Sequence, residues 1–311
     1  MIERKEWTRP ASSGQGEIFS RLWAGEKPRA ILEIAHGMAE HSGRYDAFAA
    51  YMAEQGFAVC MNDHAGHGKS AVVQGHFAEE NGWDFVVEDL HALMEEVKGR
   101  YPGLPCFLMG HSMGSFLSRS YLVTHGEGLS GCILCGTMGT NPGARWGRLL
   151  AALQKKIKGP RSPGRLLDRL ATGGYNKRIQ NPVNRSAWLS TVDEVCRAYE
   201  EDPDCGFVFT AAGYEDLFSA VMAVNSREWA GKVPAGVPIY LVAGEEDPVG
   251  NYGKGVQEVY ERLRAAGKTD TRLKLYPGKR HELLNESNRE EVYADILNCL
   301  NGWLSVKQET K

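Results

Sequence analysis

Short runs of apolar residues recur along the chain, and each is followed by a polar or glycine-rich turn and then by a stretch with helical spacing. Continuous apolar runs of this kind are typical of strands buried on both faces of a parallel sheet. The runs lie at residues 30–35, 57–62, 106–109, 132–135, 238–243 and 272–276. The helical stretches lie at 44–55, 83–99, 112–125, 254–266 and 289–304. This alternation predicts an α/β fold with a mostly parallel, doubly wound sheet, in which ligand chemistry belongs at the carboxyl ends of the strands.

Two segments depart from this alternation. Residues 5–10 and 17–23 flank a turn with the sequence ASSGQG, which predicts a hairpin at one edge of the sheet. Residues 139–232 contain several helical stretches but no good strand run, which predicts a helical insertion between two strands. We therefore expect a core formed by residues 1–138 and 233–311, with a helical cap at 139–232.

Composition and charge narrow the class of protein. The chain is 42% hydrophobic and 24% charged, as in globular proteins, and its net charge of −3 provides no overall field that would attract nucleic acid. The first residues lack the apolar core of a signal peptide, and no apolar run in the sequence is long enough to span a bilayer. We therefore expect a cytoplasmic protein with no nucleic-acid partner.

The cysteine and histidine patterns predict neither a metal site nor a cofactor. The seven cysteines lie mostly in apolar surroundings, which favours reduced, buried thiols. Cys132 and Cys135 have CxxC spacing, but they lie within a predicted strand and lack a second pair of ligands. The segment DHAGHGKS contains His64 and His67, but its spacing matches no metal motif and its glycines suit a tight loop.

Ser112 is the strongest candidate for a nucleophile. It lies in the pentapeptide GHSMG (110–114), which has the G-x-S-x-G pattern of a strand–turn–helix elbow. Glycines at the flanking positions relieve crowding at such a turn, and the N-terminus of the following helix points N–H groups at developing negative charge. The alternative is a chance pentapeptide in a chain with 36 glycines, in which Ser112 only caps a helix.

An oxyanion hole requires two N–H donors, and the sequence offers a candidate for each. Met113 directly follows Ser112, and Met38 follows His36 and Gly37 in the loop after the run at 30–35. We interpret the His36 side chain as structural, because its hydrogen bonds would order this loop.

Asp247 and His281 are the candidates for the remaining members of a catalytic triad. Asp247 lies in GEEDPV after the run at 238–243, and His281 follows the next run. Of the nine histidines, only His125 and His281 lie well after Ser112, and His125 ends the helix that Ser112 begins, too far along it to reach back. Proline after a carboxylate favours Asp247 over its two glutamate neighbours, although a helix-capping role for Asp247 remains open.

Five motifs in this order resemble the monoacylglycerol lipase and lysophospholipase group of α/β-hydrolases, which is also described as similar to the serine aminopeptidases S33. The motifs are HGMAEHSGRY, DHAGHGKS, GHSMGS, GEEDPVG and RHELLNE, and together they cover most of the chain. The resemblance implies a Ser112–Asp247–His281 triad, an oxyanion hole from Met38 and Met113, a helical cap, and a structural role for DHAGHGKS. One departure is Ser115, where many members have a third glycine, and it puts the close packing of the following helix in question.

The leading functional hypothesis is a serine hydrolase that cleaves an ester of a monoacylglycerol or lysophospholipid through an acyl-enzyme on Ser112. An aminopeptidase or amidase with the same triad is the alternative. It would need a carboxylate in the cap to bind a free amino terminus, and the candidates are Glu200, Glu201, Asp202 and Asp204. A catalytically silent binding protein is a third hypothesis, against which the intact triad argues.

The cap contains candidate contacts for an acyl chain. Trp146 begins an apolar stripe with helical spacing and interleaved arginine and lysine residues at 145–158. This stripe would either contact acyl chains or a lipid surface, or else pack on the core with its charges in water. Phe207 and Phe209 are the other candidates for substrate contact, and core packing explains them equally well.

Overall fold

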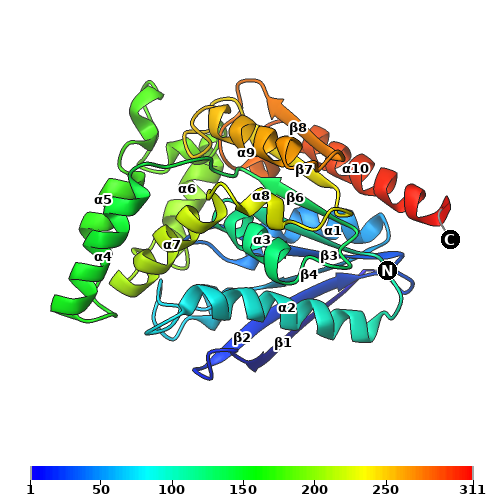
Figure 1. Cartoon of the computed structure of the whole chain (residues 1–311), viewed down its shortest axis with the longest axis horizontal. Coiled ribbons are helices and arrows are strands. Elements are labelled where there is room, and N and C mark those ends of the chain that lie inside the picture. Colours follow the sequence, from blue (N-terminus) through cyan, green and yellow to red (C-terminus); the bar gives the residue numbers. More distant parts are fainter. Residues whose placement is uncertain (1, 310–311) are drawn as a thin grey trace.

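Eight strands form the single sheet of the computed structural model, which describes residues 2–309 (Figure 1). The strands are β1 (Glu3–Pro10), β2 (Glu17–Ala24), β3 (Ala30–Ala35), β4 (Phe57–Asn62), β5 (Cys106–His111), β6 (Gly131–Cys135), β7 (Ile239–Gly244) and β8 (Thr271–Tyr276). Their order across the sheet is β1-β2-β4-β3-β5-β6-β7-β8. The pairs β1–β2 and β2–β4 are antiparallel, and all the others are parallel. The predicted fold class and the hairpin at one edge are therefore confirmed.

Helices cover both faces of this sheet. The helices of the core are α1 (Asp46–Glu54), α2 (Gly82–Arg100), α3 (Met113–Thr124), α9 (Lys254–Ala265) and α10 (Arg289–Glu309). The apolar side chains of α1 and α10 share one buried cluster, and those of α2, α3 and α9 share another on the opposite face. All the residues of β3 to β7 are buried, as expected for strands covered on both sides.

The segment between β6 and β7 contains a separate group of helices. They are α4 (Ala144–Lys158), α5 (Arg165–Thr172), α6 (Asp193–Glu201), α7 (Ala211–Val224) and α8 (Trp229–Lys232). In Figure 1, α4 and α5 lie at one end of the molecule, and α7 lies between them and α3. The helical insertion expected from the sequence is thus present, while its division from the core at residues 139 and 232 stays a prediction.

Arg119, on α3, forms hydrogen bonds near both ends of this insertion. Its guanidinium donates to the carbonyl oxygen of Met138 at 2.9 Å, where the chain leaves β6. It also donates to the Val224 carbonyl and to Asn225 Oδ1, at the end of α7, the latter at 3.0 Å. A single buried side chain therefore holds the start and the end of the insertion beside the nucleophile's helix.

The described residues contain neither a membrane-spanning helix nor a disulfide. No helix among residues 2–309 combines the length and the apolar character that a bilayer crossing requires. All seven cysteines are buried, and none of them is joined in a disulfide.

The topology gathers the loops that carry the candidate site residues. Strands β3, β5, β7 and β8 run parallel, so their carboxyl ends meet at one edge of the sheet. The loop with Met38 follows β3, Ser112 follows β5, Asp247 follows β7 and His281 follows β8. Residues far apart in sequence are thereby brought to the same edge.

Glu33 is an unusual residue in the middle of β3. It is fully buried, and neither of its carboxylate oxygens has a hydrogen-bond partner among the described residues. It lies opposite Cys60 and Leu108 in the neighbouring strands. Burial raises the pKa of Glu33 well above its usual range, and the charge of Arg9 offsets this only in part. The folded chain therefore favours the protonated, neutral carboxyl group.

We expect Glu33→Gln to stabilise the protein increasingly as pH rises. A carboxyl group whose pKa is higher in the folded than in the unfolded protein destabilises the fold once it ionises in the unfolded chain. This ionisation begins near the ordinary pKa of 4.5. Above that pH the variant should gain about 1.4 kcal/mol of unfolding free energy per pH unit, until the folded pKa of Glu33 is reached. Urea unfolding at about pH 5 and about pH 8 measures the difference. Glu54→Gln, at an exposed position on α1, is the control. A gain for Glu33→Gln that does not grow with pH would contradict the prediction.

Candidate active site

Ser112 lies at the turn between β5 and α3 with a strained backbone. Its φ of 53° and ψ of −120° fall in a region that residues with a side chain rarely adopt. Two backbone hydrogen bonds hold this geometry. The Ser112 N–H donates to the Cys135 carbonyl at 2.9 Å, and the Ser115 N–H donates to the Ser112 carbonyl at 2.8 Å.

The glycines on either side of Ser112 are required by backbone packing. A Cβ atom at Gly110 would lie 2.1 Å from the Gly114 carbonyl oxygen, and one at Gly114 would lie 2.0 Å from the Ala35 carbonyl oxygen. The Ser112 side chain makes no capping hydrogen bond to α3. This argues against the interpretation in which Ser112 only caps the helix. Ser115 fits without disturbing the helix, because its buried hydroxyl donates to the Ser112 carbonyl at 2.6 Å.

His281 and Asp247 form a buried pair. His281 Nδ1 lies 2.9 Å from Asp247 Oδ2, and the Val249 N–H donates to Asp247 Oδ1 at 2.8 Å. The pair packs closely on Gly136, where a Cβ atom would lie 3.0 Å from His281 Cε1. The carboxylate therefore fixes the ring orientation and favours the tautomer with a proton on Nδ1.

The environment of His281 favours its protonation compared with a free imidazole. Burial disfavours the charged ring, but the carboxylates of Asp247, Glu282 and Glu40 together outweigh this effect, so the pKa of His281 lies above its ordinary value. Its Nε2 has no hydrogen-bond partner among the described residues. Ser112 and His281 line the same cavity, although no hydrogen bond joins them in the described part of the chain.

Histidines order the loop that contains Met38. His36 Nδ1 donates to the Gly37 carbonyl at 2.8 Å, and His36 Nε2 accepts from the His64 N–H at 3.0 Å. His67 Nε2 accepts from the Ala39 N–H at 3.3 Å. Burial lowers the pKa of His36 and His64 well below the usual range and that of His67 to about 4, so all three rings stay neutral near pH 7. Met38 and Met113 both line the cavity beside Ser112.

Three charged residues that the sequence analysis did not identify link this loop to the loop of His281. Arg44 donates to both carboxylate oxygens of Glu282, at 2.6 and 2.7 Å, and to Glu40 at 2.7 Å. Glu40 in turn accepts from the Gly37 N–H at 2.5 Å and from the Tyr45 hydroxyl at 2.8 Å. The two carboxylates are buried and each is compensated by the same arginine. No local signal in the sequence indicates this, because Arg44 and Glu282 lie 238 positions apart.

The cavity has a volume of about 520 Å³ and a mixed wall. Its apolar side chains come from α3, from the chain after β6, from the insertion and from the loops beside Ser112, and they include Phe116, Met138, Trp188, Phe207, Leu217, Phe218 and Val221. Its polar side chains come mainly from the insertion, and they include Asp168, Arg169, Asn176, Arg185, Ser186 and Tyr199. Ser112 and His281 therefore face a space with both an apolar and a polar boundary.

The structure brings only one of the three predicted substrate contacts to this cavity. Phe207 lines the wall, whereas Phe209 does not. Phe209 is fully buried and packs on Phe77 and Tyr214, with ring centroids 5.4 and 5.6 Å away. Trp146 is 69% exposed and does not border the cavity. Helical spacing identifies an apolar face, but it does not tell what covers that face.

The acidic residues considered for binding an amino terminus do not line the cavity either. Glu200 accepts from the Ser186 hydroxyl at 2.5 Å and pairs with Arg185 at 3.2 Å. Asp202 accepts from His41 at 3.0 Å. These two carboxylates are therefore already engaged within the protein.

Comparisons with known proteins identify relatives that match over most of the chain. The family model described as serine aminopeptidase, S33, matches residues 26–288. The chain is 27% identical to the monoacylglycerol lipase of Mycolicibacterium smegmatis, over 92% of this chain and 93% of that protein. It is 28% identical to the monoglyceride lipase of Homo sapiens, over 94% of this chain and 88% of that protein. A solved structure of a carboxyl esterase from Bacillus coagulans in complex with glycerol has a TM-score of 0.91 and 34% identity, with 97% of this chain and 99% of that chain covered.

We expect Arg44→Met to destabilise the fold strongly. The substitution leaves Glu40 and Glu282 as buried carboxylates without a counter-charge, which should lower the unfolding free energy by about 3–5 kcal/mol. Arg4→Met is the control, because Arg4 pairs with Glu6 and Asp46 at a side chain that is 42% exposed. That variant should lose less than about 1 kcal/mol. Urea unfolding near neutral pH measures both, and equal losses would contradict the prediction.

Proposed function

The chain belongs to the serine aminopeptidase S33 family and is a carboxylic ester hydrolase with the α/β-hydrolase fold, and we propose that Ser112 is its nucleophile and a monoacylglycerol or lysophospholipid its substrate. The observation that carries the proposal is the strained Ser112, held between two obligatory glycines and facing the cavity that the His281–Asp247 pair also lines. Backbone strain of this kind persists where the surrounding structure enforces it, and it is common at catalytic sites.

The proposed mechanism uses His281 as the proton carrier. Its Nε2 accepts the Ser112 hydroxyl proton as Oγ attacks the ester carbonyl, and the imidazolium then donates this proton to the leaving alcohol. Asp247 holds the tautomer and stabilises the transient positive charge. The N–H groups of Met38 and Met113 donate to the oxyanion, and water activated by His281 hydrolyses the acyl-enzyme.

The mixed composition of the cavity wall supports the proposal that the substrate is an ester with one apolar and one polar part. An acyl chain fits the apolar side, which includes Phe207 and Leu217, and a polar alcohol fits the side with Asn176 and Tyr199. The two lipases named above are named for monoacylglycerol or monoglyceride, and the structure of the carboxyl esterase was solved in complex with glycerol. We therefore propose a glycerol-like or glycerophosphoryl alcohol as the leaving group. An aminopeptidase activity has less support, because Glu200, Glu201, Asp202 and Asp204 do not border the cavity. Asp168 is a carboxylate of the insertion that does border it, but it already accepts from the Tyr214 hydroxyl at 2.9 Å.

A fluorophosphonate probe tests the nucleophile, and we expect it to label the wild type but not Ser112→Ala. The variant should also lower kcat/KM for a monoacylglycerol by about four to six orders of magnitude, with the fold retained. Ser120→Ala, further along α3, is the matched control and should keep both properties. A panel of monoacyl esters and lysophospholipids of graded chain length, assayed beside aminoacyl amides, tests the substrate class. Absence of wild-type labelling would refute the nucleophile, and faster turnover of an aminoacyl amide than of every ester would refute the substrate.

A second proposal concerns the outer face of α4 and α5, which we infer docks on a lipid surface. Among the described residues, seven of the nine exposed large hydrophobic side chains lie on these two helices: Trp146, Leu149, Leu150, Leu153, Ile157, Leu166 and Leu170. Only Ala144, Gly147 and Ala151 of α4 are buried, so the stripe does not pack on the core as one interpretation expected. Exposed cations flank this face: Arg145, Lys156, Lys158, Arg165 and Arg169. Arg169 also lines the cavity, so the face adjoins the site from which a lipid would enter.

Vesicle sedimentation tests this docking surface. We expect the wild type to bind vesicles containing an anionic phospholipid more strongly than vesicles of phosphatidylcholine alone. Trp146→Ser combined with Ile157→Ser should lower the partition coefficient by about tenfold or more, because the variant has less apolar surface to bury in the lipid. Val72→Ser, which removes an apolar side chain that is 75% exposed elsewhere, is the control. No sedimentation of the wild type with either vesicle would refute the docking surface.

A further inference from the structure

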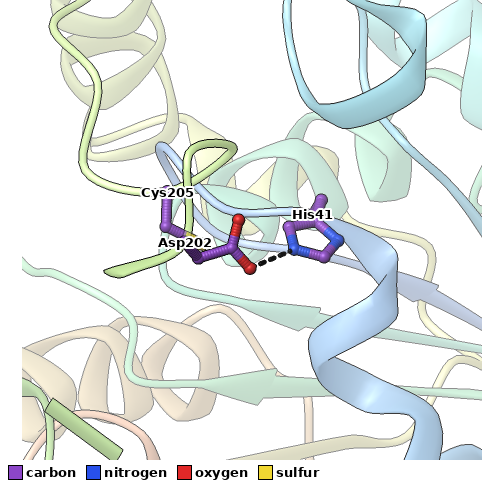
Figure 2. A group of neighbouring side chains, drawn as sticks. All are labelled: His41, Asp202 and Cys205. Carbon is purple, nitrogen blue, oxygen red and sulfur yellow. Dashed lines mark hydrogen bonds and ion pairs between the residues drawn. The ribbon is translucent and has the colours of Figure 1, made fainter. Parts of the chain in front are cut away.

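His41, Asp202 and Cys205 gather where the insertion meets the loop after β3 (Figure 2). Each side chain offers one ligand atom, and these nitrogen, oxygen and sulfur atoms all lie within 4.8 Å of one another. His41 directly follows Glu40, and Asp202 directly follows α6. The group therefore joins two segments that lie 161 positions apart.

Hydrogen bonds orient the three side chains. His41 Nε2 donates to Asp202 Oδ2 at 3.0 Å, and His41 Nδ1 accepts from the Gly43 N–H at 3.2 Å. Asp202 Oδ1 accepts from the Asp204 N–H at 2.8 Å, which leaves Oδ2 directed at His41. The side chains of His41 and Asp202 are 18% and 32% exposed, so an ion can reach them from solvent, while Cys205 is buried behind them.

We propose that this group is a binding site for a divalent transition-metal ion of the zinc class. Imidazole nitrogen, carboxylate oxygen and thiolate sulfur are the three ligand types that Zn²⁺ uses in proteins, and three protein ligands leave a fourth position for water. Mg²⁺ and Ca²⁺ do not fit, because they require six or more ligands that are almost entirely oxygen. The site lies outside the cavity, since none of these three residues lines it.

Ion binding releases one proton, moves another and replaces two hydrogen bonds. The Cys205 thiol releases its proton to solvent, and the imidazole proton moves from Nε2 to Nδ1 so that Nε2 can bind the ion. The hydrogen bonds from His41 to Asp202 and from Gly43 to His41 are both lost, and the bonds from Nε2, the carboxylate and the thiolate to the ion replace them.

The ion would join the cap to the oxyanion loop at a place where they already touch. The Ala39 carbonyl accepts from the Gly206 N–H at 2.9 Å and from the Tyr199 hydroxyl at 2.8 Å. Gly206 directly follows Cys205, and Ala39 lies two positions before His41. A metal bond across this contact therefore ties the two segments together more firmly than the existing hydrogen bonds.

Cobalt(II) provides a direct test, because a thiolate ligand gives Co²⁺ a strong near-ultraviolet charge-transfer band. We expect titration of the reduced wild type with Co²⁺ to produce this band with one equivalent bound, and Zn²⁺ to displace it. Cys205→Ser should abolish the band, and Asp202→Asn should weaken Co²⁺ binding by about tenfold or more. Cys196→Ser is the matched control, since Cys196 is a buried cap cysteine outside the group.

Thermal unfolding provides a second readout that does not depend on catalysis. Zn²⁺ should raise the unfolding midpoint of the wild type and of Cys196→Ser but not that of Cys205→Ser, because it binds only the folded site. Circular dichroism of the metal-free variants checks that each is folded. A band that survives in Cys205→Ser, or no saturable thiolate band in the folded wild type, would overturn the proposal. An ion held only by His281 and Asp247 gives no thiolate band and would also count against it.

Discussion

The backbone contact between the start of α3 and the end of β3 determines the geometry of the candidate site. At Gly114 the helix lies against the Ala35 carbonyl so closely that no side chain fits between them. This contact brings the loop after β3 next to the turn after β5, so that Met38 and Met113 line one cavity with Ser112. Ser112 then has no relaxed backbone conformation available, because β5 fixes one side of the turn and α3 fixes the other. Two close approaches thus require the two glycines, one of Gly114 to the Ala35 carbonyl and one of Gly110 to the Gly114 carbonyl.

Charge pairing fixes the other loops at this edge of the sheet. His281 is oriented by Asp247, and the neighbouring Glu282 shares Arg44 with Glu40 in the loop after β3. The loop of the candidate base and the candidate oxyanion loop are therefore joined by one arginine side chain. Such a network holds its parts in place because loss of the shared arginine would leave both buried carboxylates without a counter-charge.

Local sequence patterns were sufficient to predict the fold, and they also provided the central candidates for the site. Six apolar runs marked the strands β3 to β8, because strands that are covered on both faces leave a continuous signal, and the turn sequence between residues 10 and 17 marked the hairpin of β1 and β2. Ser112, Asp247 and His281 could be proposed because each follows a strand within a recognisable turn. The Glu40–Arg44–Glu282 network and the group around His41 could not, since their partners meet only through the tertiary fold. Phe209 and Trp146 show the complementary limit: apolar character predicts burial or contact, but only the fold decides which surface is covered.

The position of the helical insertion has an evolutionary consequence. The chain leaves β6 and returns at β7, and these two strands are direct neighbours in the sheet. The inserted residues can therefore lengthen, shorten or change sequence without altering the order or register of any strand, since the closure of a longer loop adds little entropic cost. With Arg119 holding both ends of the insertion beside α3, mutation can diversify the polar and apolar walls of the cavity while the residues at the strand ends stay under separate selection.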